Sequence, residues 1–200
     1  KQHIDWNDTK NVLIYLGNNI YPAGMPDEGS KDYASAKTVF DYQLSVVQDK
    51  NAKAFFVPGN NDWKRGKTGG LEQVRNEWRY VNSLQLPNVQ VLPANGCPGP
   101  VDIQVGDKVV IVFMDSQWWL QKGERAGVES NCDFKTEEEV IAALNDIIGT
   151  YTDKLILLAT HHSFYPNGKQ SHYKNLISQV EEIMKKHSNV IQAAGHDQNL

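Results

Sequence analysis

The stretch KAFFVPGNND, Lys53–Asp62, decides the fold class of this chain. Its apolar half, Ala54–Pro58, predicts a buried strand, and the Pro-Gly pair predicts a turn that ends it. Two amides and a carboxylate, Asn60, Asn61 and Asp62, follow directly. In open α/β sheets the carboxyl ends of strands are where ligands bind, because the loops there converge on a crevice. The stretch therefore predicts a strand of an α/β sheet with a candidate site at its end.

The rest of the chain alternates between strand patterns and helix patterns. Short apolar runs in NVLIYLGN, KLILLATHH and NVIQAAGHDQ predict buried strands, and VDIQVGDKVVIVFMDS predicts a hairpin. Helical spacing predicts helices over 31–47, around Leu71–Val81, after a capping box at Thr136 and Glu139, and over Leu176–Met184. We therefore expect a layered α/β sandwich, with mixed β-sheets flanked by helices, that occupies residues 1–200 as one domain.

Composition narrows the classes of partner and compartment. The 200 residues carry 20 basic and 24 acidic side chains, a net charge of −4, with no basic stripe of the kind that nucleic acid requires. No apolar run is long enough for a transmembrane segment, and the first residues lack a signal region. Cys97 and Cys132 are compatible with one disulfide or with two free thiols, so they leave the redox compartment open.

Four of the predicted strands end in polar clusters. The sequences GNNIY, GNND, THHS and GHDQ each place an Asn or a His at what we expect to be a shared edge. Imidazole nitrogens and amide oxygens suit a divalent ion such as zinc, iron or manganese, whereas no Ser, His and Asp arrangement suggests a nucleophilic triad. The pattern predicts a crevice of the metal-binding type.

These clusters carry a resemblance to a known family. The chain resembles the calcineurin-like metallophosphoesterases of the purple-acid-phosphatase type, whose motifs run DxG, GDxxY, GNH(D/E), VxxH and GHxH. The last four are similar to Gly17–Tyr21, Gly59–Asp62, Leu158–His161 and Gly195–Gln198, in that order. The residues that flank these motifs resemble those of a bacterial branch of the family found in the Bacteroidota. The resemblance implies a binuclear metal centre, a phosphoesterase fold and further chain at both ends, since the first motif would lie upstream of Lys1.

Three positions depart from the family pattern. Asn18 stands where the family has an aspartate that bridges two ions, Asn61 where it has a His that stabilises the phosphate, and Gln198 where it has a His ligand. His162 and Asp62 are expected to line the crevice. The ligand positions that keep a family residue are Tyr21, Asn60, His161 and His196.

The departures predict an impaired site. A neutral amide does not offset the repulsion between two ions, and Asn61 does not act as a general acid near neutral pH. We therefore expect no metal or one weakly bound divalent ion. The expected function is that of a pseudophosphatase, a binding or scaffold module in the bacterial cell envelope or periplasm with a protein partner. The alternative is an active metal-dependent phosphoesterase that hydrolyses phosphate monoesters or diesters.

A structural explanation of the same residues stays open. Asn18, Asn61 and Asp62 are also typical turn residues, because Asn and Asp tolerate left-handed backbone and hydrogen-bond their own loop. His161 and His196 at buried strand ends are also compatible with packed histidines of the core.

Overall fold

The computed structural model describes residues 4–127, 131–164 and 174–197. Its strands are β1 (Val12–Tyr15), β2 (Lys53–Phe56), β3 (Val89–Val91), β4 (Val101–Val105), β5 (Val109–Phe113), β6 (Leu155–Thr160) and β7 (Val190–Ala194). Its helices are α1 (Tyr33–Leu44), α2 (Gly70–Ser83), α3 (Ser116–Leu120), α4 (Glu137–Thr150) and α5 (Lys174–Lys186), with short 3₁₀ turns η1 (Lys64–Gly66) and η2 (Ala94–Gly96). The predicted strands and helices occur in the predicted order, and the short helix α3 is an element that was not predicted.

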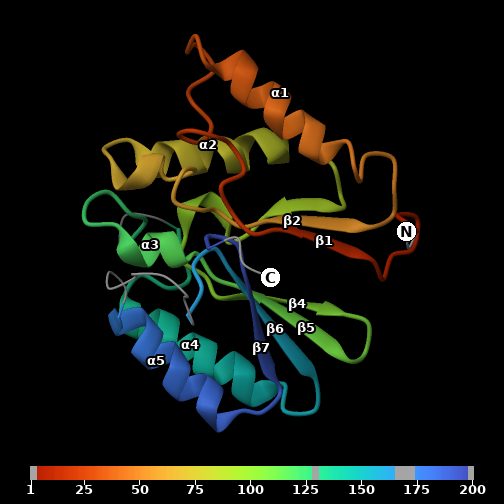
Figure 1. Ribbon diagram of the computed structural model, residues 1–200, viewed down its shortest axis with the longest axis vertical. Helices are drawn as coiled ribbons and strands as arrows, with labels where there is room; N and C mark the ends of the chain where they lie inside the picture. The colour runs from red at the N-terminus through yellow and green to blue at the C-terminus, as the bar shows by residue number, and fades with distance from the viewer. Residues whose placement is uncertain (1–3, 128–130, 165–173, 198–200) are drawn as a thin grey trace.

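The strands form two sheets that are stacked between layers of helices. The first sheet is parallel, in the order β1-β2-β3, and the second has the order β4-β5-β6-β7. In the second sheet the β4–β5 hairpin is antiparallel, while β5, β6 and β7 are parallel. Helices α1 and α2 cover the outer face of the first sheet, and α4 and α5 cover that of the second (Figure 1). The mixed α/β sandwich expected from the sequence is confirmed.

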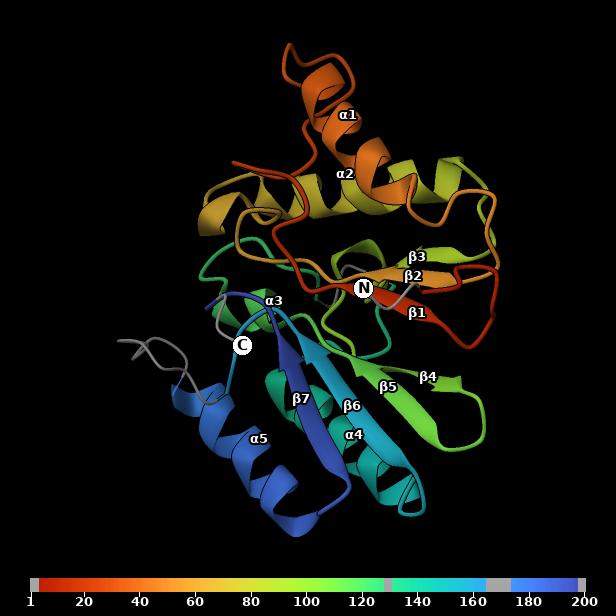
Figure 2. The ribbon, with the colours of Figure 1, turned by 45° about the vertical axis from the view of Figure 1, so that its right-hand side comes forward.

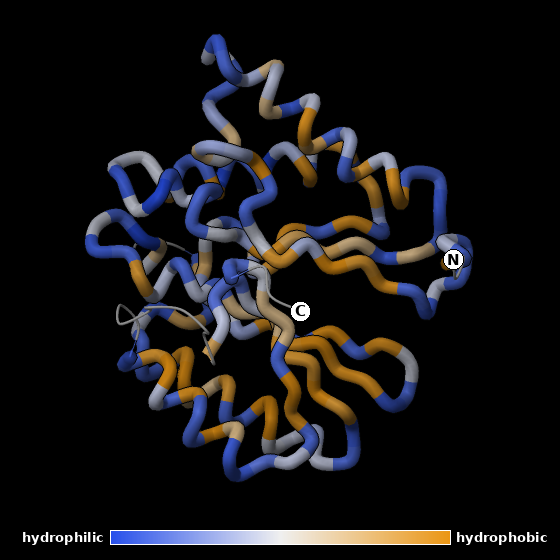
Figure 3. The backbone as a smooth tube through the Cα atoms, viewed as in Figure 1, coloured by the Kyte–Doolittle hydropathy of each residue, from blue (hydrophilic) through white to orange (hydrophobic). Residues whose placement is uncertain are grey.

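The core is built where apolar strands face each other and their helices. Phe55 of β2 and Phe113 of β5 pack with ring centroids 4.9 Å apart in the layer between the sheets. Both are almost fully buried, as expected for central strands that are covered on both faces. Figure 3 shows the strands mainly in the hydrophobic colour and the surrounding loops mainly in the hydrophilic one.

Local sequence signals account for individual elements. Helix α4 begins with the predicted capping box: the Thr136 hydroxyl accepts the Glu139 N–H, and the Glu139 carboxylate accepts the Thr136 N–H. Its buried face is formed by Val140, Leu144 and Ile148. Within the described parts of the chain, no helix is both long and apolar enough to cross a bilayer.

A disulfide joins Cys97 to Cys132 and so decides between the two alternatives that the sequence left open. It links the segment after η2 to the segment before α4 across a sequence separation of 35. Both cysteines pack in the core cluster that contains Trp63 and Trp118. The disulfide therefore fixes these two segments to each other and to the core at one end of the sandwich.

The carboxyl ends of four strands meet at that end of the molecule (Figure 2). The N–H groups of Gly195 and His196 both donate to the His161 carbonyl oxygen, at 3.0 and 2.9 Å. The backbones are so close that a Cβ on Gly59 would overlap the backbone nitrogen of Asn18, and one on Gly17 would overlap the His161 ring. Glycine is required at both positions because only it permits this approach.

Candidate functional site

Strand ends from both sheets bring five of the predicted residues together. Asn18 follows β1, Asn60 and Asn61 follow β2, His161 follows β6 and His196 follows β7. Hydrogen bonds and close donor atoms connect them, as described below. We call these five residues the strand-end cluster.

His161 lies at the centre of the cluster. Its Nδ1 donates to the Leu16 carbonyl oxygen at 2.7 Å, because a carbonyl only accepts. Its Nε2 therefore carries the lone pair of the neutral ring. That atom lies 3.0 Å from the Asn60 Oδ1 and 3.1 Å from the His196 Nδ1. The geometry gathers three potential ligand atoms around one point.

Burial keeps His161 neutral. Loss of solvation lowers its pKa to about 4, and the hydrogen bond to Leu16 opposes the shift only in part. A neutral imidazole is the form that coordinates a metal ion. Near neutral pH the His161 ring is thus in its coordinating form.

His162 points to a different partner. Its Nδ1 lies 2.9 Å from the Ser116 hydroxyl, and its backbone N–H donates to the same oxygen at 3.0 Å. Burial lowers the pKa of His162 to about 2, with His161 as a further unfavourable neighbour. Ser116 was not predicted as a site residue, because its only sequence signal is its place after a buried strand. Because Ser116 is fully buried, this Ser–His pair fixes α3 to β6 and presents no accessible nucleophile.

Asn18 is engaged in holding the loops together. It has φ 60°, in the left-handed region, as the turn explanation predicts. Its Oδ1 accepts the Asn61 N–H at 2.8 Å, and its Nδ2 faces the Tyr21 hydroxyl at 3.4 Å. Tyr21 itself is 57% exposed. The amide thus presents a donor, and no charge, toward the Tyr21 side.

Asn61 is bonded to a cation of the run KRGK, Lys64–Lys67, which from sequence alone is compatible with a phosphate-attracting segment or with a solvated loop. Its side-chain oxygen accepts the Arg65 Nε at 2.8 Å. Lys64 and Arg65 both have positive φ, 53° and 55°, and the Arg65 N–H donates back to the Asn60 carbonyl oxygen at 2.6 Å. This tight turn returns Arg65 to the strand-end cluster.

Asp62 lies behind the cluster, contrary to the expectation that it lines the crevice. It is fully buried, and its carboxylate accepts the N–H groups of Gly59, Asn19 and Ile20 at 2.7, 3.2 and 3.1 Å. Burial raises its pKa to about 6, while these backbone donors favour the charged form and limit the rise. Asp62 is the anchor that holds the loop after β1 to the loop after β2.

Two further buried acids, absent from the sequence analysis, lie behind Asp62. Asp115 caps α3 by accepting the N–H groups of Gln117 and Trp118, and it accepts the Trp63 Nε1 at 2.8 Å. Glu77 of α2 accepts the Asn19 Nδ2 at 2.8 Å. Burial raises the pKa of Asp115 to about 7 and that of Glu77 well above its usual value. We call Asp62, Glu77 and Asp115 the buried acid group.

The strand-end cluster fits one divalent ion better than two. Asn60 Oδ1 and His161 Nε2 are both acceptors, so their approach to 3.0 Å is unfavourable unless the amide rotates or a cation lies between them. Two oxygen or nitrogen ligands of one zinc ion, each about 2.1 Å from it, lie at roughly such a separation. The Nδ1 atom of His196 is a third potential metal ligand, 3.1 Å from His161 Nε2. A second ion has no carboxylate among these residues, since Asn18 stands at the expected bridging position; Gln198 lies outside the described residues.

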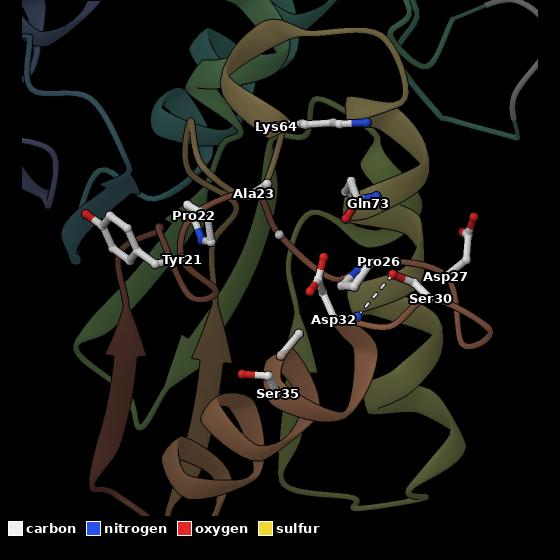
Figure 4. Close-up of a pocket in the computed structure, with 12 residues that line it drawn as sticks. Tyr21, Pro22, Ala23, Pro26, Asp27, Ser30, Asp32, Ser35, Lys64 and Gln73 are labelled. Carbon is white, nitrogen blue, oxygen red and sulfur yellow. Dashed lines mark hydrogen bonds between the residues drawn. The ribbon is translucent and has the colours of Figure 1, made fainter.

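A cavity of about 420 Å³ opens beside the cluster at Tyr21. Figure 4 shows Tyr21 and Pro22 on one side of it and Asp32 on another, with Lys64 extending past Gln73. Its walls carry charges of both signs. The cavity adjoins the cluster through the contact between Tyr21 and Asn18.

Comparisons with known proteins bear on the fold. No protein-family model matches the sequence, and no curated protein does. A solved structure described as "GAP50 the anchor in the inner membrane complex of Plasmodium" is similar, with a TM-score of 0.57 at 16% identity. The match covers 98% of this chain and 64% of that one, so this chain spans less than two thirds of its length. At this identity the likeness shows the fold alone.

Proposed function

We propose that the protein is a metallophosphoesterase-type domain whose hydrolytic site is impaired and which serves as a binding or scaffold module. One observation carries this proposal: the strand-end cluster contains no carboxylate, and Asn18, at the expected bridging position, uses its amide to contact Asn61 and Tyr21. A module of this kind keeps the fold of a metalloenzyme but lacks the anionic ligands that hold its metal ions.

Electrostatics supports this proposal. Two divalent ions a few ångströms apart repel strongly, and anionic ligands are what offset that repulsion in a protein. When bound, such ions activate a water molecule as the nucleophile. The residues of this chain hold His161 and Asn60 in place for coordination, yet they add no negative charge. We expect one weakly held zinc, iron or manganese ion, or none.

Loss of the general acid supports the same conclusion. In the family that the sequence resembles, a His occupies the position of Asn61. An amide donates a hydrogen bond but does not transfer a proton near neutral pH, and general acid catalysis typically contributes about 10²–10⁴ in rate. Here the oxygen of Asn61 is already bonded to Arg65. The residue therefore positions a neighbour and does not protonate a leaving group.

An active metal-dependent phosphoesterase is the second candidate. The observation that favours it is the convergence on His161 Nε2, which has a ligand atom of Asn60 at 3.0 Å and one of His196 at 3.1 Å. One ion with an open position is sufficient for some hydrolytic zinc sites. This candidate requires turnover that depends on these three residues.

A scaffold role implies a partner and a place. We propose a protein partner in the cell envelope or periplasm, on the basis of the bacterial resemblance of the motifs. GAP50, a structural neighbour, is described as the anchor in the inner membrane complex of Plasmodium, and an anchoring role agrees with a scaffold role for this chain. The disulfide agrees with an oxidising compartment.

Hydrolysis of p-nitrophenyl phosphate, measured with added Mn²⁺, Zn²⁺ or Fe²⁺ and again with chelator, tests the proposal. We expect no turnover above the blank and no effect of the chelator. The matched variants are Asn60→Ala and His196→Ala, with Asn145→Ala of α4 as a control away from the cluster. Metal-dependent turnover that both cluster variants abolish and the control retains would establish the second candidate instead.

A further inference from the structure

Arg65, in the loop after β2, is held in place by an unusual backbone conformation and by two hydrogen bonds. Arg65 has left-handed backbone, its N–H is bonded to Asn60, and its Nε is bonded to Asn61. Left-handed conformation is unfavourable for a residue with a long side chain, and Lys64 beside it adopts it as well. Two strained residues in succession bring one guanidinium against the cluster.

The charged end of Arg65 remains available. Only Nε is used by Asn61, and within the described ranges the two terminal nitrogens have no hydrogen-bond partner. A guanidinium presents its donors as a planar fork that matches two oxygens of a phosphate or carboxylate. The side-chain nitrogen of Asn61 is a further donor, because its oxygen already accepts from Arg65.

The remainder of the cluster contains no carboxylate and no other guanidinium or ammonium group. It consists of the amides of Asn18, Asn60 and Asn61 and the imidazoles of His161 and His196. The nearest buried carboxylate, Asp62, is enclosed by backbone N–H groups behind the loops. Arg65 is thus the cation that the loop after β2 brings into contact with the cluster.

We propose that Arg65, positioned by Asn61, is the anion-binding residue of this site, and that its ligand is a phosphate monoester. The inference rests on the proposed function and deepens it. Arginine stays protonated at all physiological pH values, so it binds the phosphate group without giving a proton to the leaving alcohol. The pair of Arg65 and Asn61 binds the ester and leaves its P–O bond intact. Lys64, the residue before Arg65 in the loop, lines the cavity that begins at Tyr21, and this cavity offers space for the organic part of the ester.

Calorimetric titration with inorganic phosphate and with phenyl phosphate, each with and without EDTA, tests the proposal. Wild-type protein is expected to bind both anions in EDTA, and phenyl phosphate more tightly because its ring enters the cavity. Arg65→Gln is expected to weaken both about tenfold to a hundredfold, the range for loss of a charged hydrogen-bonding group. Arg65→Lys restores the charge but not the fork, so an intermediate affinity is expected.

The control is Arg79→Gln, which removes a guanidinium that pairs with Glu72 on the exposed face of α2. Its affinity for both anions is expected to equal that of the wild type, and thermal unfolding verifies that each variant is folded. Equal binding by wild type and Arg65→Gln, or no binding by either, would overturn the inference. Hydrolysis of p-nitrophenyl phosphate with added metal would instead overturn the proposed function, while the loss of affinity in Arg65→Gln would still support Arg65 as the anion-binding residue.

Discussion

The two sides of the loops at the strand ends differ sharply in charge. Behind the loops lies the buried acid group, three carboxylates that bind backbone and indole N–H groups and an amide. In front lies the strand-end cluster, whose potential ligands are amides and imidazoles. The carboxylates of the buried acid group support the fold, whereas the strand-end cluster has no carboxylate that could hold a pair of metal ions. Under the proposed function, the chain therefore keeps the architecture of a hydrolase site without the negative charge that hydrolysis requires.

The largest loss of stability is expected from a substitution in the buried acid group. Asp62→Ala leaves three buried N–H groups without their acceptor, and each such loss costs about 1–3 kcal/mol. We expect the free energy of unfolding to fall by about 4 kcal/mol in urea denaturation. Asp32→Ala, which removes an exposed carboxylate, is the matched control and is expected to change it by less than about 0.5 kcal/mol. Equal effects of the two variants would show that Asp62 is not the anchor.

The disulfide supports the same rear region. Replacing Cys97 and Cys132 by Ser frees a loop that the bond closes over a separation of 35 residues. The entropy of the unfolded chain then rises, and we expect a loss of about 3 kcal/mol of stability. Urea denaturation of the double variant, compared with reduced wild type, measures this loss. A double variant as stable as the oxidised protein would contradict the expectation.

A carboxylate introduced into the strand-end cluster tests whether the missing negative charge is what limits metal binding. Asn18→Asp places a carboxylate at the bridging position while keeping an oxygen that accepts the Asn61 N–H. Attraction between unit charges is worth several kcal/mol at short range in a protein, so we expect zinc affinity to rise by about 10². Competition with a chromophoric chelator measures the change. Asn145→Asp, on the exposed face of α4, is the control and is expected to give no such gain.

The smallest expected effect concerns pH. The folded-state pKa of Glu77 lies above the value of 4.5, so the folded protein retains a proton that the unfolded chain releases. Stability from this group is therefore present below pH 4.5 and is lost as pH rises through the folded-state pKa. Glu77→Gln keeps a partner for Asn19 and removes this loss.

Unfolding in urea at about pH 5 and about pH 8 measures the Glu77 effect. Wild type is expected to lose more stability between the two values than Glu77→Gln, by about 1 kcal/mol. Asp62 and Asp115 have raised pKa values and contribute with the same sign, so the slope of the variant is expected to be reduced and not abolished. An unchanged slope would show that Glu77 is charged in the folded protein.

Periodicity and turn chemistry were sufficient to predict the order of elements. The apolar runs of β2 and β6 and the capping box at Thr136 are local signals, and each predicted the right element. The placement of His161 and His196 side by side followed from the rule that parallel strands end at one edge of a sheet. Asn60 follows a strand of the other sheet and meets them because the two sheets are stacked. What those residues do stays a prediction.

The remainder depends on tertiary contacts that no local pattern encodes. Glu77 lies on the helical face of an amphipathic segment, and only the fold reveals that it meets Asn19 from the loop after β1. Asp62 was expected to line the crevice, because its position after the strand gives no indication of which way the carboxylate turns. The return of Arg65 to Asn61 requires two left-handed residues without glycine, which sequence preferences do not favour.

The number of zinc ions that the wild-type protein binds at saturation, measured by equilibrium dialysis, distinguishes an impaired site from a working binuclear centre. We expect at most one ion per chain, because the cluster holds one set of amide and imidazole ligands and no bridging carboxylate. Two tightly bound ions per chain would contradict this expectation, and would mean that a binuclear centre forms despite Asn18.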